Sequence, residues 1–213
     1  MEVKTREKVL KSVRNALLSK TDNPFPNPDT DASVYTESNN PYADITFAEE
    51  FSKAGGKFVY CDNENDLIMN LNALYQQFKY GNTYCADNEL KEILTLAMIP
   101  FSDKEEDFDN MAVSITFCEH LIARFGSIMV SSRQLSGRRA FVYPHVHIVI
   151  AYTSQLVLDI KDAFTKIKCR YTKFPSMISM ITGPSRTADI EKTLVMGAHG
   201  PKELYVFMVE DRS

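Results

Sequence analysis

Short apolar runs alternate with amphipathic segments from residue 44 to residue 209, and this alternation restricts the fold more than any other feature of the chain. The apolar runs are continuous, as expected for strands that are covered on both faces. The segments between them place apolar residues at helical spacing, for example Leu67, Leu71 and Leu74. Strands that alternate with helices predict an α/β fold with a mainly parallel sheet flanked by helices. We expect strands at 57–61, 82–85, 111–117, 127–131, 146–152, 178–182 and 204–209, and helices near 47–51 and at 63–78, 88–97, 118–124, 155–167 and 185–195.

The N-terminal part of the chain follows a different pattern. Residues 2–19 predict a basic amphipathic helix with Val9, Val13 and Leu17 on one face. Residues 21–43 contain four prolines among polar residues, which is typical of an extended linker. We therefore expect a helical arm at 1–20, a linker at 21–43 and one α/β domain at 44–213. The arm can bind acidic partners or membranes, but docking on its own domain or pairing in a homo-oligomer is the favoured interpretation.

The composition excludes several classes of protein. Lys and Arg total 24 and Asp and Glu total 28, so the formal charge is 24 − 28 = −4, which disfavours nucleic-acid binding. An apolar share of 44% is too high for a disordered chain. The longest apolar run, 146–151, is far short of the ~18 residues of a membrane span. The charged N-terminus does not resemble a signal peptide, so we expect a cytoplasmic protein.

Cysteine and histidine spacing argues against a metal centre. No two cysteines form a CxxC motif, which excludes zinc ribbons and ferredoxin-type clusters, and we expect all four in or near the core. His145 and His147 fall on the same side of a strand, where they could share a metal ion, but no third ligand is evident. One buried structural histidine and one exposed histidine is the favoured interpretation.

The turn after the strand at 178–182 is the first candidate site. Gly183 permits a tight turn, and Ser185 is a good N-cap for a helix at 185–195. Free amides at a helix start favour an anion, and Arg186 could add a bidentate contact, with Thr187 beside it. An ordinary capped helix, in which Asp189 complements the helix dipole, is the alternative that the residues alone favour.

Two further segments carry polar groups near strand ends. In the turn 197–203, His199 could act as a general acid or base and Lys202 could bind an anion, although a surface role is favoured for the histidine. Glu119 follows the strand at 111–117 and is a candidate catalytic carboxylate. Its neighbour His120 would point about 100° away on a helix, and Cys118 lacks an orienting third group, so neither forms a convincing pair. Around the next strand, the candidate ligand-binding residues are Gly126, Ser127 and Ser131.

Several of these motifs together resemble the lactate-utilisation (LUD) domain family. The stretch 182–191 followed by 197–201 is similar to the carboxyl-terminal signature of the family, and 115–119 with Gly126 and Ser127 is similar to its central motif. The resemblance covers about residues 44–213. It departs at Arg124 and Phe125, where the family usually has an acidic residue followed by Ser or Thr.

The resemblance implies the fold of ribose-phosphate isomerases and CoA transferases. It also implies a role in oxidising L-lactate to pyruvate, with partner subunits that carry the iron–sulfur clusters and no cofactor in this chain. We therefore expect a component of lactate utilisation that binds a small carboxylate or other anion. The alternatives are a stand-alone enzyme on a sugar phosphate or acyl-CoA, with Glu119 or Asp189 as acid–base or nucleophile, and a non-catalytic scaffold that uses its arm.

Overall fold

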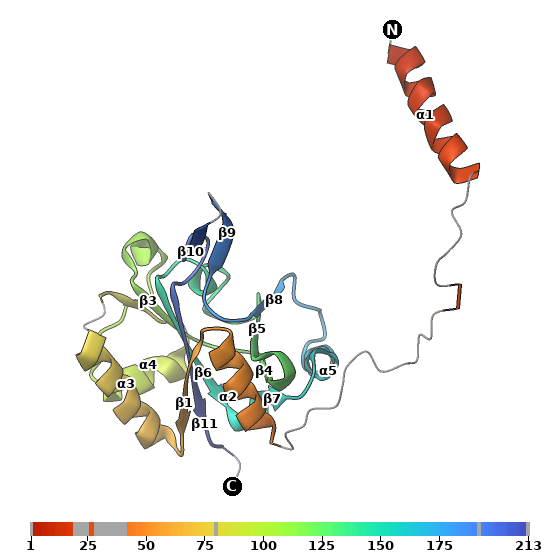
Figure 1. Cartoon of the computed structure of the whole chain (residues 1–213). Helices are drawn as coiled ribbons and strands as arrows, with labels where there is room; N and C mark the ends of the chain where they lie inside the picture. Colours follow the sequence, from red (N-terminus) through yellow and green to blue (C-terminus); the bar gives the residue numbers. More distant parts are fainter. Residues whose placement is uncertain (1, 19–25, 28–41, 79–80, 191–192, 212–213) are drawn as a thin grey trace. The chain divides into compact units, whose positions relative to one another are not determined.

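The computed structural model describes residues 2–18, 26–27, 42–78, 81–190 and 193–211 (Figure 1). Helix α1 (Glu2–Leu18) confirms the predicted N-terminal helix and belongs to a compact unit separate from the rest of the chain. Val9, Val13 and Leu17 on its apolar face are exposed. Most of the predicted linker, 21–43, lies outside the described residues, so the boundaries of arm, linker and domain stay predictions. No helix in the described ranges combines the length and apolar character needed to cross a membrane.

A parallel sheet forms the centre of the second unit, which confirms the predicted α/β architecture (Figure 1). All four pairs of neighbouring strands in the described sheet are parallel. The structure confirms the predicted strands at the centre of this sheet. These strands carry apolar side chains on both faces; for example, the neighbouring residues Ile148 and Val149 belong to different core clusters. The strand order is β1 (Lys57–Cys61), β11 (Glu203–Val209), β6 (Val146–Tyr152), β3 (Val113–Phe117) and β2 (Thr83–Tyr84).

Helices cover both faces of this sheet. Helices α3 (Glu64–Phe78) and α4 (Asn88–Leu96) bury their apolar faces in one core cluster with strand residues such as Ile148. Helix α2 (Ala43–Lys53) packs Phe47 and Phe51 into the cluster on the other face. The two rings stack with centroids 5.4 Å apart.

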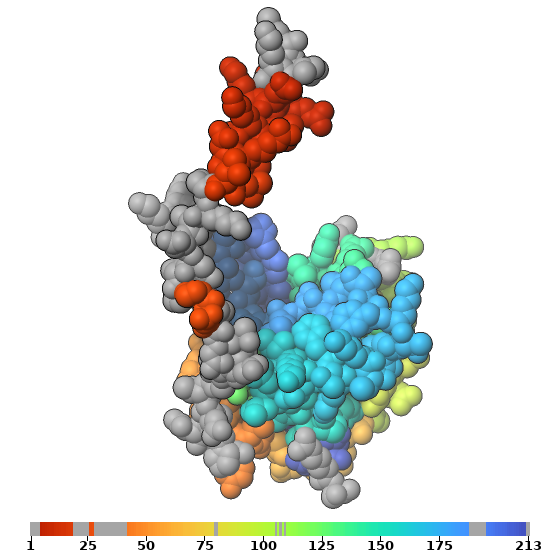
Figure 2. All heavy atoms as spheres, turned by 90° about the vertical axis from the view of Figure 1, so that its right-hand side faces the viewer, coloured from red at the N-terminus to blue at the C-terminus, as the bar shows by residue number. Residues whose placement is uncertain are grey.

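A second, mixed sheet lies on the α2 side. Its residues alternate between two cores: Leu121, Ile128 and Val130 face the first sheet, whereas Ile122 and Met129 face helix α5 (Ile160–Arg170). In the space-filling view of this side, α5 and the following segment 171–177 lie at the surface, in cyan and light blue (Figure 2). The strand order is β7 (Leu156–Val157), β4 (His120–Ile122), β5 (Ser127–Ser131) and β8 (Ile178–Ile181).

The largest difference from the sequence prediction is at 185–195, where the helix prediction is wrong. This segment forms a hairpin of β9 (Arg186–Ile190) and β10 (Thr193–Met196), paired antiparallel. Both arms are rich in β-branched residues, which favour strands, and the helical interpretation gave too much weight to Ser185 as an N-cap.

Two shorter segments also differ from prediction. The helical turn expected at 118–124 is strand β4 followed by the 3₁₀ turn η2 (Ala123–Phe125). The helix expected at 155–167 begins only at Ile160, because the Asp159 carboxylate accepts the Ile160 amide and caps it there; η4 (Thr153–Gln155) and β7 precede it. Between α4 and β3 the chain forms the 3₁₀ helix η1 (Glu105–Asn110), with Phe108 buried.

Gly126 sets how closely the second sheet approaches α2. It ends η2 in the left-handed region with φ 55°, and a Cβ built there would lie 2.2 Å from the Phe51 backbone nitrogen. A side chain at this position would therefore strike the backbone of α2. This contact gives Gly126, a predicted ligand-binding residue, a structural role.

We expect Gly126→Ala to reduce the free energy of unfolding by at least about 3 kcal/mol, because it adds a backbone clash to the cost of a left-handed alanine. Gly137→Ala is the matched control, since Gly137 has φ 68° and nothing within 4 Å of its built Cβ. It should cost only about 1–2 kcal/mol. Urea denaturation measures both. Equal costs for the two variants would contradict the close approach.

His147 lies in the middle of the parallel sheet, whereas His145 is exposed, which confirms the favoured interpretation of this pair. The Nε2 atom of His147 lies 2.9 Å from the Thr116 hydroxyl, and its ring packs against Phe141. Burial lowers the pKa of His147 to about 3 from its ordinary value of 6.5. The ring is therefore neutral near pH 7.

Because the folded-state pKa of His147 is depressed, the unfolded chain binds this proton first and stability falls as the pH drops below 6.5. Between pH 7 and pH 5, wild-type protein should lose about 2 kcal/mol more unfolding free energy than His147→Gln. Denaturant titrations at the two pH values measure this difference. Parallel pH profiles for the two proteins would show that His147 is protonated equally in both states.

Candidate functional site

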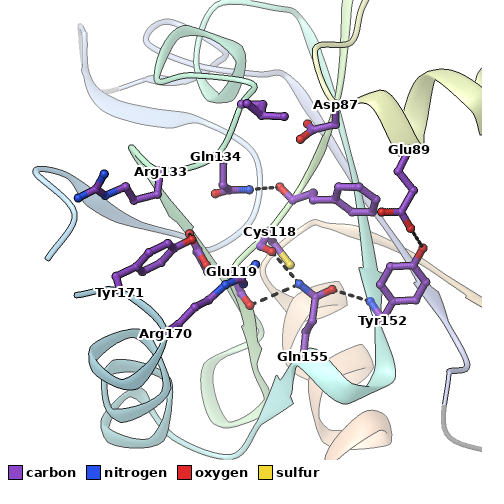
Figure 3. Close-up of a pocket in the computed structure, with 12 residues that line it drawn as sticks. Asp87, Glu89, Cys118, Glu119, Arg133, Gln134, Tyr152, Gln155, Arg170 and Tyr171 are labelled. Atoms are coloured by element: carbon purple, nitrogen blue, oxygen red, sulfur yellow. Dashed lines mark hydrogen bonds and ion pairs between the residues drawn. The ribbon is translucent and has the colours of Figure 1, made fainter. Parts of the chain in front are cut away.

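A pocket of about 330 Å³ lies beyond the carboxyl ends of three neighbouring strands of the parallel sheet (Figure 3). Asp87 follows β2, Glu119 follows β3 and Gln155 follows β6. Ligands of open parallel sheets usually bind at this edge. Twelve residues line the pocket: Asp87, Glu89, Phe117, Cys118, Glu119, Arg133, Gln134, Leu135, Tyr152, Gln155, Arg170 and Tyr171.

Glu119 is the most buried carboxylate of the pocket, with only 1% of its side chain exposed. Its Oε1 atom accepts hydrogen bonds from the Ser131 hydroxyl at 2.5 Å and the Tyr171 hydroxyl at 2.8 Å. Its Oε2 atom pairs with Arg170 Nη1 at 3.2 Å. These donors compensate for burying a carboxylate and hold its position.

Two glutamines fix the backbone that carries Glu119. Gln134 donates from Nε2 to the Phe117 carbonyl at 2.5 Å, and its Oε1 accepts the Ser131 amide. Gln155 donates to the Cys118 carbonyl at 2.7 Å, and its Oε1 accepts the Tyr152 amide (Figure 3). The segment between β3 and β4 is thereby tied to β5 and to the end of β6.

Two arginines and a tyrosine form one side of the pocket (Figure 3). The guanidinium groups of Arg133 and Arg170 lie 5.9 Å and 5.5 Å from the ring centroid of Tyr171. Arg133 also donates to the Lys173 carbonyl. A guanidinium has five N–H donors, so donors remain for a ligand on both residues.

The other side of the pocket is acidic. The Tyr152 hydroxyl donates to Glu89 at 2.9 Å. Asp87 as a whole residue is 9% exposed, and its Oδ2 atom has no hydrogen-bond partner within the described part of the chain. Burial, followed by the charge of Glu89, raises the pKa of Asp87 above its ordinary value. The pocket is thus basic on one side and acidic on the other.

Burial disfavours a nucleophilic role for the cysteine of the pocket. Cys118 is buried, and burial raises the pKa of its thiol far above neutrality, so the thiolate is not available. Cys61 and Cys85 are also buried, as expected for core residues, whereas Cys169 is exposed, which corrects that part of the prediction. Within the described residues, His, Cys, Asp and Glu side chains form no group of three that could hold a metal ion.

The structure joins two of the predicted site residues and separates the others from them. Glu119 and Ser131 are hydrogen-bonded at the pocket. Gly126 and Ser127 lie at the far end of the β4–β5 hairpin, where the Ser127 hydroxyl is 2.7 Å from that of Thr182. Binding by Gly126 and Ser127 is a prediction that this position does not support.

The anion site predicted at Gly183 depended on a helix at 185–195, but this segment forms a hairpin. The Ser185 amide donates to the Pro201 carbonyl, the Ser185 carbonyl accepts the Gly197 amide, and Arg186 donates to the Ala54 carbonyl. Thr187 pairs with Val195 across the hairpin. The amides and the guanidinium that were expected to bind an anion therefore contact protein groups instead. A ligand role for Gly183, Ser185, Arg186 and Thr187 stays an untested prediction.

The remaining predicted residues lie outside the pocket. His199 and Lys202 are exposed on the turn between β10 and β11, with the Lys202 side chain packed over Gly197. Asp189 is on β9, and its side chain lies outside the described positions. Arg124 forms an ion pair with Asp159 at 3.0 Å, which holds the start of α5.

Sequence reasoning missed most residues of the pocket, and Arg133 is among them. Asp87 and Gln155 follow predicted strands, so the strand-end rule could have found them. Gln134 follows Ser131 by one turn. Arg170 and Tyr171 carried no such indication, because their role depends on α5 ending beside Glu119. The end of α5 places Arg170 in an ion pair with Glu119.

Comparison with known proteins gives both a family and a fold. The profile of the LUD domain family matches residues 88–209, more than half of the chain. The chain is 36% identical over 103 residues to lactate utilization protein C of Bacillus licheniformis, which covers 47% of this chain and 43% of that protein. It is 33% identical over 141 residues to lactate utilization protein C 1 of Bacillus mycoides, which covers 63% and 59%. The chain thus spans about half the length of the curated relatives it matches.

A solved structure supports the fold. The crystal structure of a DUF162 family protein from Deinococcus radiodurans superposes with a TM-score of 0.57 and 18% identity, covering 78% of this chain and 96% of that one. At this identity the match supports the architecture alone. It agrees with the mainly parallel central sheet flanked by helices.

The Glu119 network predicts an order of stability losses. Glu119→Leu should reduce the free energy of unfolding by at least about 2 kcal/mol, because it leaves buried donors without an acceptor. Tyr171→Phe should cost about 1 kcal/mol. Arg170→Gln should cost less than about 1 kcal/mol, since 59% of the Arg170 side chain is exposed and water can replace it. Denaturant titration measures the three, and an Arg170 variant as unstable as Glu119→Leu would refute this order.

Proposed function

The chain belongs to the LUD domain family, and we propose that it acts in lactate utilisation by binding a small carboxylate in the Glu119 pocket. The names of its relatives support a role in lactate utilisation. The pocket offers side chains that are able to bind a carboxylate. In this proposal, the iron–sulfur clusters that oxidise lactate belong to partner subunits, and this chain holds a ligand of the assembly.

The observation that carries the proposal is the arrangement of Arg133, Arg170 and Tyr171 on one side of the pocket. Guanidinium groups recognise carboxylates through paired N–H donors, and such bonds are stronger than those between neutral groups. The Tyr171 ring lies against both guanidinium groups and restricts their movement. Small carboxylates therefore find oriented donors at the carboxyl edge of the sheet.

The charges at this side favour an anion. Glu119 neutralises Arg170 through their ion pair, so Arg133 supplies the excess positive charge. Burial of Glu119 also keeps its carboxylate behind its three donors rather than in the open part of the pocket. An incoming carboxylate thus meets the exposed Arg170 side chain before it meets Glu119.

A stand-alone enzyme on a sugar phosphate or acyl-CoA is the second candidate, and the pocket volume favours it. Lactate has six non-hydrogen atoms and would leave part of a pocket of about 330 Å³ to water or to a larger ligand. In that case Glu119 would act as acid–base or nucleophile and would first have to exchange its hydrogen bonds for contacts with the substrate.

A scaffold role for α1 is the third candidate, and its exposed apolar residues favour it. Removal of residues 1–40 followed by co-purification tests this role. Loss of partner subunits would support the arm as their interface, and full retention would exclude it.

We expect L-lactate or pyruvate to raise the melting temperature of the wild-type chain. At a hundredfold excess over Kd the stabilisation is about 2.7 kcal/mol, which corresponds to roughly 5–10 °C for a chain of this size. Arg170→Gln should abolish most of this shift because it removes a guanidinium of the pocket. Differential scanning fluorimetry measures the shift across a ligand panel that includes ribose 5-phosphate and coenzyme A.

Arg138→Gln is the matched control, because Arg138 is an exposed arginine that does not line the pocket and donates to Ser176 instead. It should keep the full shift. A shift with ribose 5-phosphate or coenzyme A, but none with lactate or pyruvate, would support the second candidate and overturn the first.

A further inference from the structure

Asp87 has a property that carboxylate binding by the arginines does not explain. The residue is 9% exposed, it lines the pocket, and its Oδ2 atom has no partner among the described residues. Buried polar atoms are normally hydrogen-bonded, so an unpaired carboxylate oxygen at a pocket indicates a missing donor. Asp87 precedes α4, but its side chain does not cap that helix.

The nearest charged groups do not supply this donor. Lys91, one turn along α4, forms its ion pair with Asp103 at 2.8 Å. Glu89 accepts from Tyr152 and is itself an acceptor. Figure 3 shows Asp87 on the side of the pocket away from Arg133, Arg170 and Tyr171, so a ligand held by the arginines has Asp87 at its other side.

We propose that Asp87 is a specificity-determining residue that accepts a hydrogen bond from a hydroxyl group of the bound carboxylate, so that the pocket selects hydroxy acids over the corresponding oxo acids. This inference rests on the proposed carboxylate site. It adds a second recognition point, at the end of β2, to the one formed by Arg133 and Arg170.

The selectivity follows from donor and acceptor chemistry. An ionised carboxylate only accepts hydrogen bonds, a hydroxyl group can donate one, and a keto oxygen cannot. An oxo acid therefore leaves Asp87 Oδ2 unpaired and places two acceptors against each other. Sites built to pair with a ligand hydroxyl discriminate strongly against analogues that lack it.

Isothermal titration of the full chain with two pairs of ligands tests the inference: L-lactate with pyruvate, and L-2-hydroxyglutarate with 2-oxoglutarate. In the wild type, at least one hydroxy acid should bind about tenfold or more tightly than its oxo partner. In Asp87→Asn the ratio should fall to within about threefold, because an amide can both accept from a hydroxyl and donate to a keto oxygen.

Glu89→Gln is the matched control, since it removes a negative charge from the same side of the pocket and leaves Asp87 in place. It should keep the hydroxy-acid preference. Equal ratios in wild type and Asp87→Asn, with binding still dependent on Arg170, would overturn the role of Asp87 and leave the carboxylate site standing. An equal loss of preference in Glu89→Gln would assign the effect to charge and also overturn it. Absence of binding by all four acids would overturn both proposals.

Discussion

The backbone between β3 and β4 is the constraint on which the rest of the structure depends. The chain leaves the parallel sheet at Phe117 and enters the mixed sheet at His120, so residues 118 and 119 join the two sheets. The side-chain amides of Gln134 and Gln155 donate to the carbonyls of Phe117 and Cys118, at the start of this short segment. Because the segment is fixed, the Glu119 carboxylate stays at the edge of both sheets, and the pocket forms beside it.

Much of the parallel sheet could be predicted from the sequence, because its strands are continuous apolar runs whose burial on both faces leaves few alternatives. The mixed sheet was harder to predict. Strand β4 has three residues, and its neighbour η2 has helical geometry, so local periodicity could not separate them. At 185–196, Ser185 is a residue that favours the start of a helix, whereas the β-branched residues after it favour strands. The antiparallel pairing of β9 with β10 stabilises the strands.

The candidate site was predictable to the extent that it follows the strand-end rule. Glu119 and Ser131 were singled out because Glu119 lies two residues after a predicted strand and Ser131 is the last residue of another. Arg170 and Tyr171 could not be found in this way, since they reach the pocket only because α5 covers the mixed sheet and ends beside Glu119. Gly183 was given a binding role because a helix was expected after it, but its turn instead packs against the Ala54 carbonyl.

A crystal structure of the chain grown or soaked with L-lactate tests the central claim most directly. We expect electron density for the ligand carboxylate within hydrogen-bond distance of the guanidinium groups of Arg133 or Arg170. Density for the ligand at the turn around Gly183, with the Glu119 pocket holding only water, would contradict it.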